Sequence, residues 1–505
     1  MGIFKSTFWR LLVIAIAAVL QIGITIYAFV RFYSMAAWIT TITTILSFLL
    51  VLYIINTSKH LSSDLIWILL ILLAPISGTI IYLLFGATIA LSKTHKAIIE
   101  ASAEASVYYQ QNQRVLNDLR KNLPGMYSQV SYIVNEGFPA YFNTGFDYYS
   151  LGEDGFPIML KELKKAQKYI FIEYFIIEEG EMWNSILEIL KEKAASGVDV
   201  RVMYDDVGSL FTLDSFYARQ LNEYGISCLS FNRLNPINSI IVNHRDHRKI
   251  MVIDGKVAFS GGINLADEYI NKKERFGVWK DNMIRITGEA VWSYTLMFLS
   301  HWNALNKQDT DYLSYKAEPL KHKRDGYIIP YADTPLDNEL LGQSVYMNII
   351  NHANDYVYIM TPYLIIDTDM INALILAAKR GVDVKIITPG IPDKKIIYMI
   401  TRSYYRTLIE GGVQIYEYTP GFLHAKVFVS DDICATVGTI NLDYRSLYLH
   451  FENGSFLVNS QKVLEVRDDA LKTLEASHEV TLKESIRNPL YSFIASTLRI
   501  FAPLM

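Results

Sequence analysis

The sequence is poor in cysteine and carries no surplus of basic residues. Its two cysteines, Cys228 and Cys434, are too few for a disulfide framework, and neither lies in a CxxC or His/Cys spacing that predicts structural zinc. Both lie in apolar stretches, where we expect small buried thiols. The formal net charge is −4, which argues against a protein that binds nucleic acid broadly through its charge.

Charged side chains are also scarce over residues 1–92, where the only ones are Lys5, Arg10, Arg31, Lys59 and Asp64. They separate three charge-free runs, at residues 11–30, 32–58 and 65–92. A membrane-spanning helix needs about 20 predominantly apolar residues, so each run is long enough. We therefore expect a membrane region over residues 1–92.

The third apolar run holds Pro75 and Gly78 near its middle. Proline removes a backbone hydrogen bond, so we expect a kinked helix or a re-entrant hairpin, and two or three apolar segments in all. Lys93 and Lys96 follow this run, and basic residues favour the cytoplasmic side of a membrane. The sequence thus predicts a multi-pass protein of the cell membrane with its remaining domains in the cytoplasm.

Beyond residue 92 the composition becomes ordinary. Residues 93–123 are polar and lack glycine and proline, which predicts a helix that stops at Pro124. Thereafter strand-like and helix-like segments alternate, as is typical of an α/β fold.

An internal repeat divides this part of the chain. GVDVRVMYDD in the first half matches GVDVKIITPG in the second, and VNHRDHRKIMVIDGKVAFSGGINL matches GFLHAKVFVSDDICATVGTINL. His247 and His424 in the last pair are 177 residues apart, too far for a solenoid, whose repeats run about 20–50 residues. We predict a membrane region at 1–92, a helical linker at 93–135, and two similar α/β domains, at 136–315 and 316–505, packed as a pseudo-dimer.

Each half holds a His-x-Lys-x4-Asp motif followed by Gly-x-x-Asn. The residues are His247, Lys249, Asp254 and Asn264 in the first half, and His424, Lys426, Asp431 and Asn441 in the second. The histidine and lysine stand two apart at the start of an apolar strand, so both side chains lie on one face and point into one pocket. Two such motifs at equivalent places in a repeat indicate function and not coincidence.

These residue types suit attack on a phosphodiester. The reaction needs a nucleophile, a proton donor for the leaving alcohol and cationic groups for the phosphoryl oxygens. Two histidines supply the first two, while the lysines and the Asn264 and Asn441 amides neutralise the oxygens. No carboxylate cluster typical of magnesium lies beside the motifs, so we expect neither metal nor cofactor. Asp254 and Asp431 end their strands before a turn, where they are suited to hold the backbone as much as to contact substrate.

The duplicated motif resembles that of the phospholipase D superfamily, and together with the apolar N-terminus it is similar to bacterial cardiolipin synthases. The resemblance rests on APISGTIIYLLFG, TPYL at 361–364, GFLHAK at 421–426, GTINLDYRS at 438–446 and a final APLM. It implies two phospholipase D-like domains, each a mixed sheet flanked by helices, preceded by transmembrane helices. It also implies that two phosphatidylglycerol molecules yield cardiolipin and glycerol through a phosphohistidine. The first apolar run is additional to the two spans typical of that family.

The resemblance further implies a role for several residues. It makes His247 the nucleophile and His424 the general acid and base, roles that the residues alone leave open. Asp281 and Glu452 are similar to acids that orient the histidines, which includes pairing across the two halves. The family often has serine after the first glycine of Gly-x-x-Asn, whereas this chain has Gly262 and Thr439, so a hydroxyl contribution in the first half stays open.

Other functions remain open at this point. They are a membrane-bound phospholipase D that transfers to water or another alcohol, a phosphodiesterase acting on nucleic acid, and a scaffold with an inactive fold. The partners expected are phosphatidylglycerol and cardiolipin, no nucleic acid is expected, and the oligomeric state is open. Near the C-terminus, apolar residues at helical spacing predict a helix that lies in the membrane interface or packs on the core: Leu490, Phe493, Ile494, Leu498 and Phe501.

Overall fold

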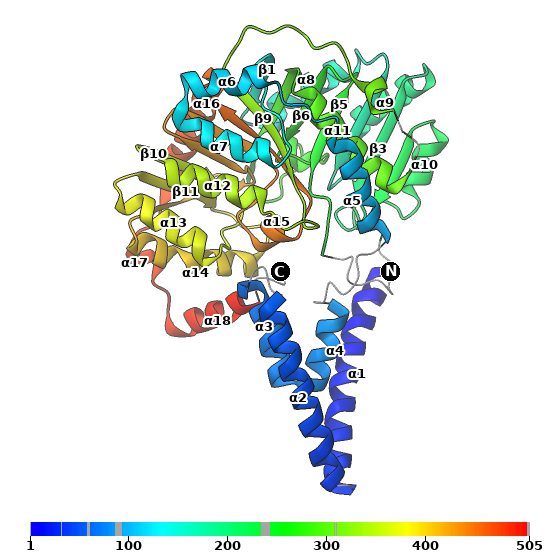
Figure 1. The fold of residues 1–505 in the computed structure, drawn as a ribbon, viewed down its shortest axis with the longest axis vertical. Helices are drawn as coiled ribbons and strands as arrows, with labels where there is room; N and C mark the ends of the chain where they lie inside the picture. The colour runs from blue at the N-terminus through cyan, green and yellow to red at the C-terminus, as the bar shows by residue number, and fades with distance from the viewer. Residues whose placement is uncertain are drawn as a thin grey trace. The chain divides into compact units, whose positions relative to one another are not determined.

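The computed structural model describes residues 2–31, 33–57, 61–85, 93–233, 243–307, 309 and 311–501 (Figure 1). The chain divides into two compact units. The smaller contains residues 1–92, 234–243 and 497–505, and the larger contains residues 93–233 and 244–496. Both repeats of the sequence therefore belong to one unit.

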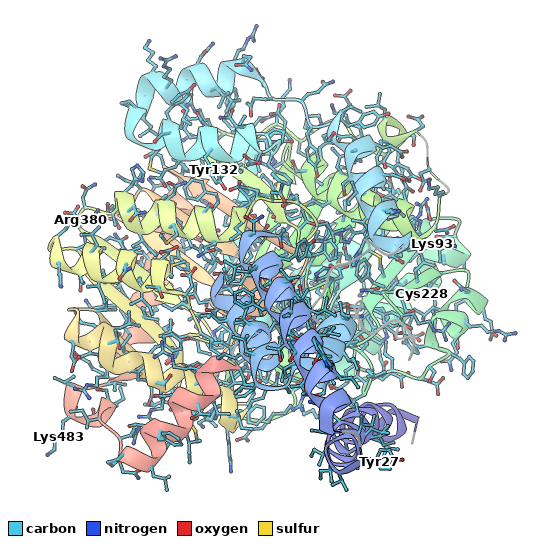
Figure 2. The ribbon with its side chains drawn as sticks, turned by 60° about the horizontal axis from the view of Figure 1, so that its bottom comes forward. Tyr27, Lys93, Tyr132, Cys228, Arg380 and Lys483 are labelled. Atoms are coloured by element: carbon cyan, nitrogen blue, oxygen red, sulfur yellow. The ribbon has the colours of Figure 1, made fainter. Side chains whose placement is uncertain are left out.

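The smaller unit is built from apolar helices: α1 (Gly2–Arg31), α2 (Tyr33–Thr57), α3 (Leu61–Leu73) and α4 (Pro75–Phe85). Within α2, Ala37–Thr57 is a stretch of 21 residues with a mean hydropathy of 2.2, and only 17% of its most apolar window is buried, unlike the core helix of a soluble protein. Among the described residues it is the one helix long and apolar enough to cross a membrane, since Ala15–Tyr27 and Asp64–Leu73 are shorter. Figure 2 labels Tyr27, an exposed residue of α1. The multi-pass arrangement and the cytoplasmic orientation stay predictions.

The third apolar run forms a helical hairpin, one of the two arrangements expected from Pro75 and Gly78. A Cβ added to Gly78 would stand 2.2 Å from the carbonyl oxygen of Leu70, although residues eight apart in a continuous helix are about 12 Å apart. The chain therefore reverses between α3 and α4. The Ser47 hydroxyl on α2 donates to the carbonyl of Pro75 at 3.2 Å, which ties α2 to the bend.

The polar segment after residue 92 differs from the single helix that we predicted. It forms α5 (Lys93–Ser106), α6 (Gln113–Asn122) and α7 (Pro124–Asn135). The Asn112 side chain accepts from the backbone N–H of Arg114 and so starts a new helix, while Pro124 begins α7 because its missing N–H costs nothing in a first turn. Ile98 and Ala105 of α5 are buried in the core. This segment is therefore part of the larger unit, and the domain boundaries at 135 and 315 stay predictions.

Two mixed sheets form the larger unit. The first has the order β1-β8-β6-β5-β2-β3-β4 and the second β17-β12-β11-β10-β14-β15-β16-β9. The first sheet contains β1 (Thr144–Tyr149), β2 (Tyr169–Tyr174), β3 (Asp199–Asp205), β4 (Ser227–Phe231), β5 (Lys249–Ile253), β6 (Val257–Gly261) and β8 (Met283–Gly288). The second contains β9 (Tyr327–Asp333), β10 (Tyr356–Met360), β11 (Asp383–Pro389), β12 (Gln414–Tyr418), β14 (Val427–Ser430), β15 (Cys434–Gly438), β16 (Glu452–Val458) and β17 (Ser477–Glu479). A short parallel pair, β7 (Val278–Lys280) with β13 (Gly421–Leu423), joins the two halves.

The two sheets share one plan, which confirms the predicted pair of similar α/β domains. In the first, β2, β3 and β4 are parallel and β5 runs antiparallel beside β2. In the second, β10, β11 and β12 are parallel and β14 runs antiparallel beside β10. The strands that carry the motifs, β5 and β14, thus lie at equivalent places near the middle of each sheet.

Helices cover both sheets and fill the space between them (Figure 1). They are α8 (Gly152–Leu163), α9 (Glu181–Ala195), α10 (Tyr217–Glu223), α11 (Val291–Leu305), α12 (Leu341–His352), α13 (Thr368–Lys379), α14 (Lys395–Glu410), α15 (Tyr444–Tyr448), α16 (Gln461–Glu475) and the short η2 (Asp267–Ile270) and η3 (Tyr312–Tyr315). Near the C-terminus, α17 (Leu482–Ser485) packs on α14, and α18 (Pro489–Ile500) follows it. One core cluster joins residues of α11 and α16 to residues of both sheets, such as Val252 and Val429. The two halves therefore share one hydrophobic core.

The two cysteines are buried, whereas the C-terminal helix exposes apolar side chains. Cys228 (Figure 2) and Cys434 are free and buried, as expected. On α18, Leu490 is 69% and Phe493 70% exposed, so these two side chains do not pack on the core. Phe501, the last described residue, is 43% exposed. The final APLM lies outside the described residues.

The motif aspartates lie at the far ends of β5 and β14 from the histidines. Asp254 and Asp431 have positive φ angles of 52° and 55°. The Asp254 carboxylate accepts from the backbone N–H groups of Gln167, Lys168 and Tyr169, and the Asp431 carboxylate from those of Asn354, Asp355 and Tyr356. Each aspartate therefore ties the turn after its own strand to the start of the neighbouring strand, β2 or β10, which is a structural role.

Replacing Asp254 by alanine should destabilise the larger unit by about 2–4 kcal/mol, because three backbone N–H groups lose their acceptor. Thermal unfolding of the full chain in detergent measures the effect as a lowered midpoint. Asp468→Ala is the control, since that carboxylate is 53% exposed and bonded to Arg467. Equal midpoints for the two variants would show that Asp254 is not structural.

Candidate active site

Each motif lies at the end of its sheet where the parallel strands finish. Lys249 begins β5 and pairs with Tyr174, the last residue of β2, while Val427 begins β14 and pairs with Met360, the last residue of β10. The histidine and lysine of each motif therefore lie where the parallel strands end. All four side chains are buried, His247, Lys249, His424 and Lys426 being between 0% and 7% exposed.

Backbone hydrogen bonds fix each histidine to the opposite half. The N–H of His247 donates to the carbonyl of Phe451 at 2.9 Å, and the N–H of His424 donates to that of Lys280 at 2.7 Å. The N–H of Phe451 in turn donates to the carbonyl of Arg245 at 2.9 Å. In both halves, the accepting residue immediately precedes one of the predicted orienting acids.

Those acids contact the histidines across the halves. His247 Nδ1 lies 2.9 Å from both carboxylate oxygens of Glu452, and His424 Nδ1 lies 2.6 Å from Oδ2 of Asp281. A carboxylate on Nδ1 favours the tautomer with its proton there, which leaves Nε2 free to react. Each half thus holds the imidazole of the other in one orientation.

The two carboxylates are supported differently. The Thr439 hydroxyl donates to Glu452, while Asp281 receives the backbone N–H of Asn282 at 2.8 Å. At the position equivalent to Thr439, a Cβ on Gly262 would stand 2.0 Å from Oδ1 of Asp281, so only glycine fits there. The first half therefore has no hydroxyl at this place, which answers the question left open by the sequence.

Burial and crowded charge shift the pKa values of the site. Burial lowers the pKa of Lys249 to about 7 and that of Lys426 to about 8, against the pull of the two carboxylates. Burial and then the Lys426 charge lower the pKa of His424 to about 4. Burial, followed by Lys249, lowers the pKa of His247 well below its usual value, and both Lys426 and His424 act on it too. All four groups therefore belong to one site.

The motif asparagines differ in their contacts. Asn264 accepts from the N–H of Ile176 at 3.1 Å and donates to the hydroxyl of Tyr269 at 2.7 Å, and the Tyr269 ring lies 5.5 Å from that of His424. The Oδ1 atom of Asn441 is buried and has no hydrogen-bond partner among the described residues. Binding of phosphate by these amides stays a prediction.

Sequence reasoning missed His450. Its ring lies 5.6 Å from that of His247, and its Nδ1 lies 3.8 Å from Oε1 of Glu452. Within the described part of the chain neither ring nitrogen makes a hydrogen bond, and burial lowers the pKa of His450 well below its usual value. The available signal was its place two residues before Glu452, the spacing that turns side chains of an extended segment to one side.

Among the described residues, two clusters hold residue types that could bind a metal ion: His247, His450 and Glu452, and separately Glu173, Asp246 and His301. In the second, the Arg248 guanidinium donates to both carboxylates and so already supplies a positive charge. In the first, the Glu452 carboxylate is already engaged by His247. Chemistry without a metal stays a prediction.

Comparisons with known proteins agree with this geometry. A family profile described as "Cardiolipin synthase, PLD-like domain" matches residues 159–302 and 346–473, and one described as "Phospholipase_D-nuclease N-terminal" matches residues 45–86. A cardiolipin synthase of Halalkalibacterium halodurans is 34% identical over 89% of the chain and 90% of its own length. Cardiolipin synthase 2 of Bacillus anthracis is 32% identical over 92% and 90%, and an uncharacterized Streptococcus mutans protein is 47% identical over 90% and 99%. The crystal structure of phosphatidylserine synthase from Haemophilus influenzae, with a TM-score of 0.57 and 16% identity, covers 74% of this chain and 98% of its own and shows the same fold.

The lowered pKa values of the two lysines predict that binding of a phosphodiester is accompanied by proton uptake from the solvent. Glycerophosphoglycerol keeps a single negative charge between pH 6 and 9, and that charge should raise the lowered pKa of Lys249 and Lys426. At pH 8 Lys249 is about one-tenth and Lys426 about half protonated, so binding should take up between one and two protons, and the affinity should fall by more than tenfold per pH unit above that.

Calorimetry in two buffers of different ionisation enthalpy measures this uptake. Lys249→Met should remove most of it at pH 8, because Lys249 has the lower pKa. A binding heat that does not depend on the buffer would contradict the prediction.

Proposed function

This chain belongs to the cardiolipin synthase family of phospholipase D-type phosphatidyltransferases, and we propose that it joins two phosphatidylglycerol molecules into cardiolipin with release of glycerol. The observation that carries the proposal is the pair of histidines, each oriented by a carboxylate of the other half. One such pair can hold a nucleophile, and the second can move the proton that a transfer between two alcohols requires.

In the first step Nε2 of His247 attacks phosphorus of the donor lipid, and the bond from phosphorus to the headgroup oxygen breaks. His424 gives its Nε2 proton to that oxygen, so that glycerol leaves neutral and the phosphatidyl group stays on His247. Burial lowers the pKa of His247 well below its usual value, which favours the neutral imidazole that an attack on phosphorus needs. Lys249 and Lys426, with the Asn264 and Asn441 amides, stabilise the charge on the phosphoryl oxygens.

In the second step a hydroxyl of the second phosphatidylglycerol attacks phosphorus. His424 takes its proton, the bond from phosphorus to His247 breaks, and cardiolipin forms. Glu452 and Asp281 stabilise the imidazolium that each step creates. We place the reaction at the cytoplasmic face of a membrane that the chain enters with its apolar helices, on the strength of Lys93 and Lys96 after the last of them.

The purified full chain in detergent, given phosphatidylglycerol alone, should produce cardiolipin and free glycerol in equal amounts, as measured by mass spectrometry. His247→Ala and His424→Ala should each abolish the product. Phosphatidic acid as the sole product would replace the proposal with a hydrolase, and cardiolipin only after addition of another lipid would change the acceptor.

Radiolabelled donor should separate the roles of the two histidines. His424→Ala should retain label on protein, because His247 can still attack an activated donor with a good leaving group, whereas His247→Ala should retain none. Label on His247→Ala and none on His424→Ala would reverse the assignment.

Gly262→Ala should reduce transfer by roughly 10²-fold, because its Cβ displaces the Asp281 carboxylate from His424. Gly125→Ala on α7 is the matched control, since its added Cβ meets nothing within 4 Å, and it should keep full activity. Equal activity of the two variants would show that Asp281 does not position His424.

A further inference from the structure

Two loops in equivalent places in the halves carry exposed apolar side chains. Residues 206–216 connect β3 to α10 and hold Phe211, 83% exposed, and Phe216, 64% exposed. Residues 390–396 connect β11 to the first turn of α14 and hold Ile391, 40% exposed, and Ile396, 55% exposed. Isolated exposed apolar residues are ordinary, but a matched pair of apolar loops indicates an interaction surface.

The strand register places both loops at the strand ends that carry the two motifs. Tyr174 of β2 pairs with Lys249 on one side and with Tyr204 of β3 on the other, so β3 ends beside the first motif. In the second half Met360 pairs likewise with Val427 and with Ile387 of β11. The loops after β3 and β11 therefore leave the sheets at the same strand ends as the two histidines.

The first loop is held in place by hydrogen bonds. The backbone N–H of Gly208 donates to Asp205, the Thr212 hydroxyl donates to the carbonyl of Ile177 at 2.6 Å, and the Ser209 hydroxyl donates to that of Phe175. The Phe175 ring lies 5.0 Å from that of His247. One side of the loop thus supports the site, while the other side holds Phe211 out into solvent.

The second loop adds positive charge. Lys394 and Lys395 are exposed next to Ile396, while the Asp393 carboxylate accepts from the Tyr363 hydroxyl at 2.7 Å. The first loop carries the exposed Asp214, which accepts from the N–H of Phe216. Apolar side chains beside lysines fit the boundary layer of a bilayer that contains anionic phospholipid.

We propose that these two loops form a bilayer-docking surface, in which Phe211, Phe216, Ile391 and Ile396 enter the membrane interface and Lys394 and Lys395 lie against anionic headgroups. The site between the loops then opens onto the lipid layer, so a phospholipid enters it without leaving the membrane completely. The proposal rests on the proposed function for the identity of the substrate lipid, whereas contact with the bilayer does not depend on turnover.

Single engineered cysteines test the proposal in the full chain, because both native cysteines are only 4% exposed and escape labelling. Phe211→Cys and Ile391→Cys, each labelled with an environment-sensitive dye, are reconstituted in vesicles of phosphatidylglycerol and phosphatidylcholine. The matched controls are Leu313→Cys (55% exposed) and Ile433→Cys (38% exposed). Leu313 lies on η3, whose Tyr315 carbonyl accepts from the hydroxyl of Tyr169 at the start of β2, and Ile433 lies two residues after Asp431, so both are far along the strands from the histidines. Lipids with a nitroxide close to the headgroup should quench the dye at 211 and 391 several-fold more than at 313 and 433.

Equal quenching at the test and control positions, or none at 211 and 391, overturns the docking surface. Dye at 211 that is shielded from water yet untouched by the nitroxide lipid overturns it too, in favour of contact with a second copy of the chain. Quenching needs no turnover, so a chain that docks and makes no cardiolipin contradicts only the proposed function.

Activity gives an independent readout. The double variant Phe211→Ser, Phe216→Ser should lose about tenfold in transfer in vesicles and stay within twofold of the unaltered chain in detergent micelles, where substrate reaches the site without docking. Leu313→Ser should change neither rate. An equal loss in vesicles and in micelles would assign the two phenylalanines to the site itself and overturn the docking role.

Discussion

The bond between a buried imidazole and a carboxylate of the other half is the constraint on which the structure depends. A buried histidine without a partner takes several orientations, and a carboxylate without a partner is costly to bury. Glu452 and Asp281 meet both needs only if the two halves are placed to within a few tenths of an ångström. The core shared by α11, α16 and both sheets, and the backbone bonds at Phe451 and Lys280, supply that placement.

Local patterns predicted the fold well and the long-range pairing only in part. Strand alternation and the repeat located β5 and β14 and brought each histidine together with its lysine, because both depend on neighbours in sequence. The break between α5 and α6 was missed, since it follows from the cap at Asn112. The partner of each histidine was raised only through a resemblance, because residues 205 apart, such as His247 and Glu452, meet through the packing of whole sheets. His450 went unnoticed since its place beside the ring of His247 exists only in three dimensions.

Basic side chains outnumber the carboxylates at the site. Two lysines and two histidines are buried there beside two carboxylates, and burial, followed by the repulsion among the basic groups, lowers the pKa values of all four. In the proposed reaction, a phosphodiester brings a negative charge to this cluster of basic groups. The same groups would then bind best when the phosphoryl oxygens carry most charge, which is the condition for lowering a barrier and not only for holding a lipid.

Gly262 and Thr439 occupy matching positions in the two halves. The first must lack a side chain to leave room for Asp281, whereas the second needs its hydroxyl to donate to Glu452. In a dimer of identical chains, one residue would have to serve both places, and any change that suited one histidine would fall on the other as well. Fusion of the two copies into one chain removes that coupling. The near-symmetric molecule therefore gives each histidine its own surroundings, which mutation can change one histidine at a time.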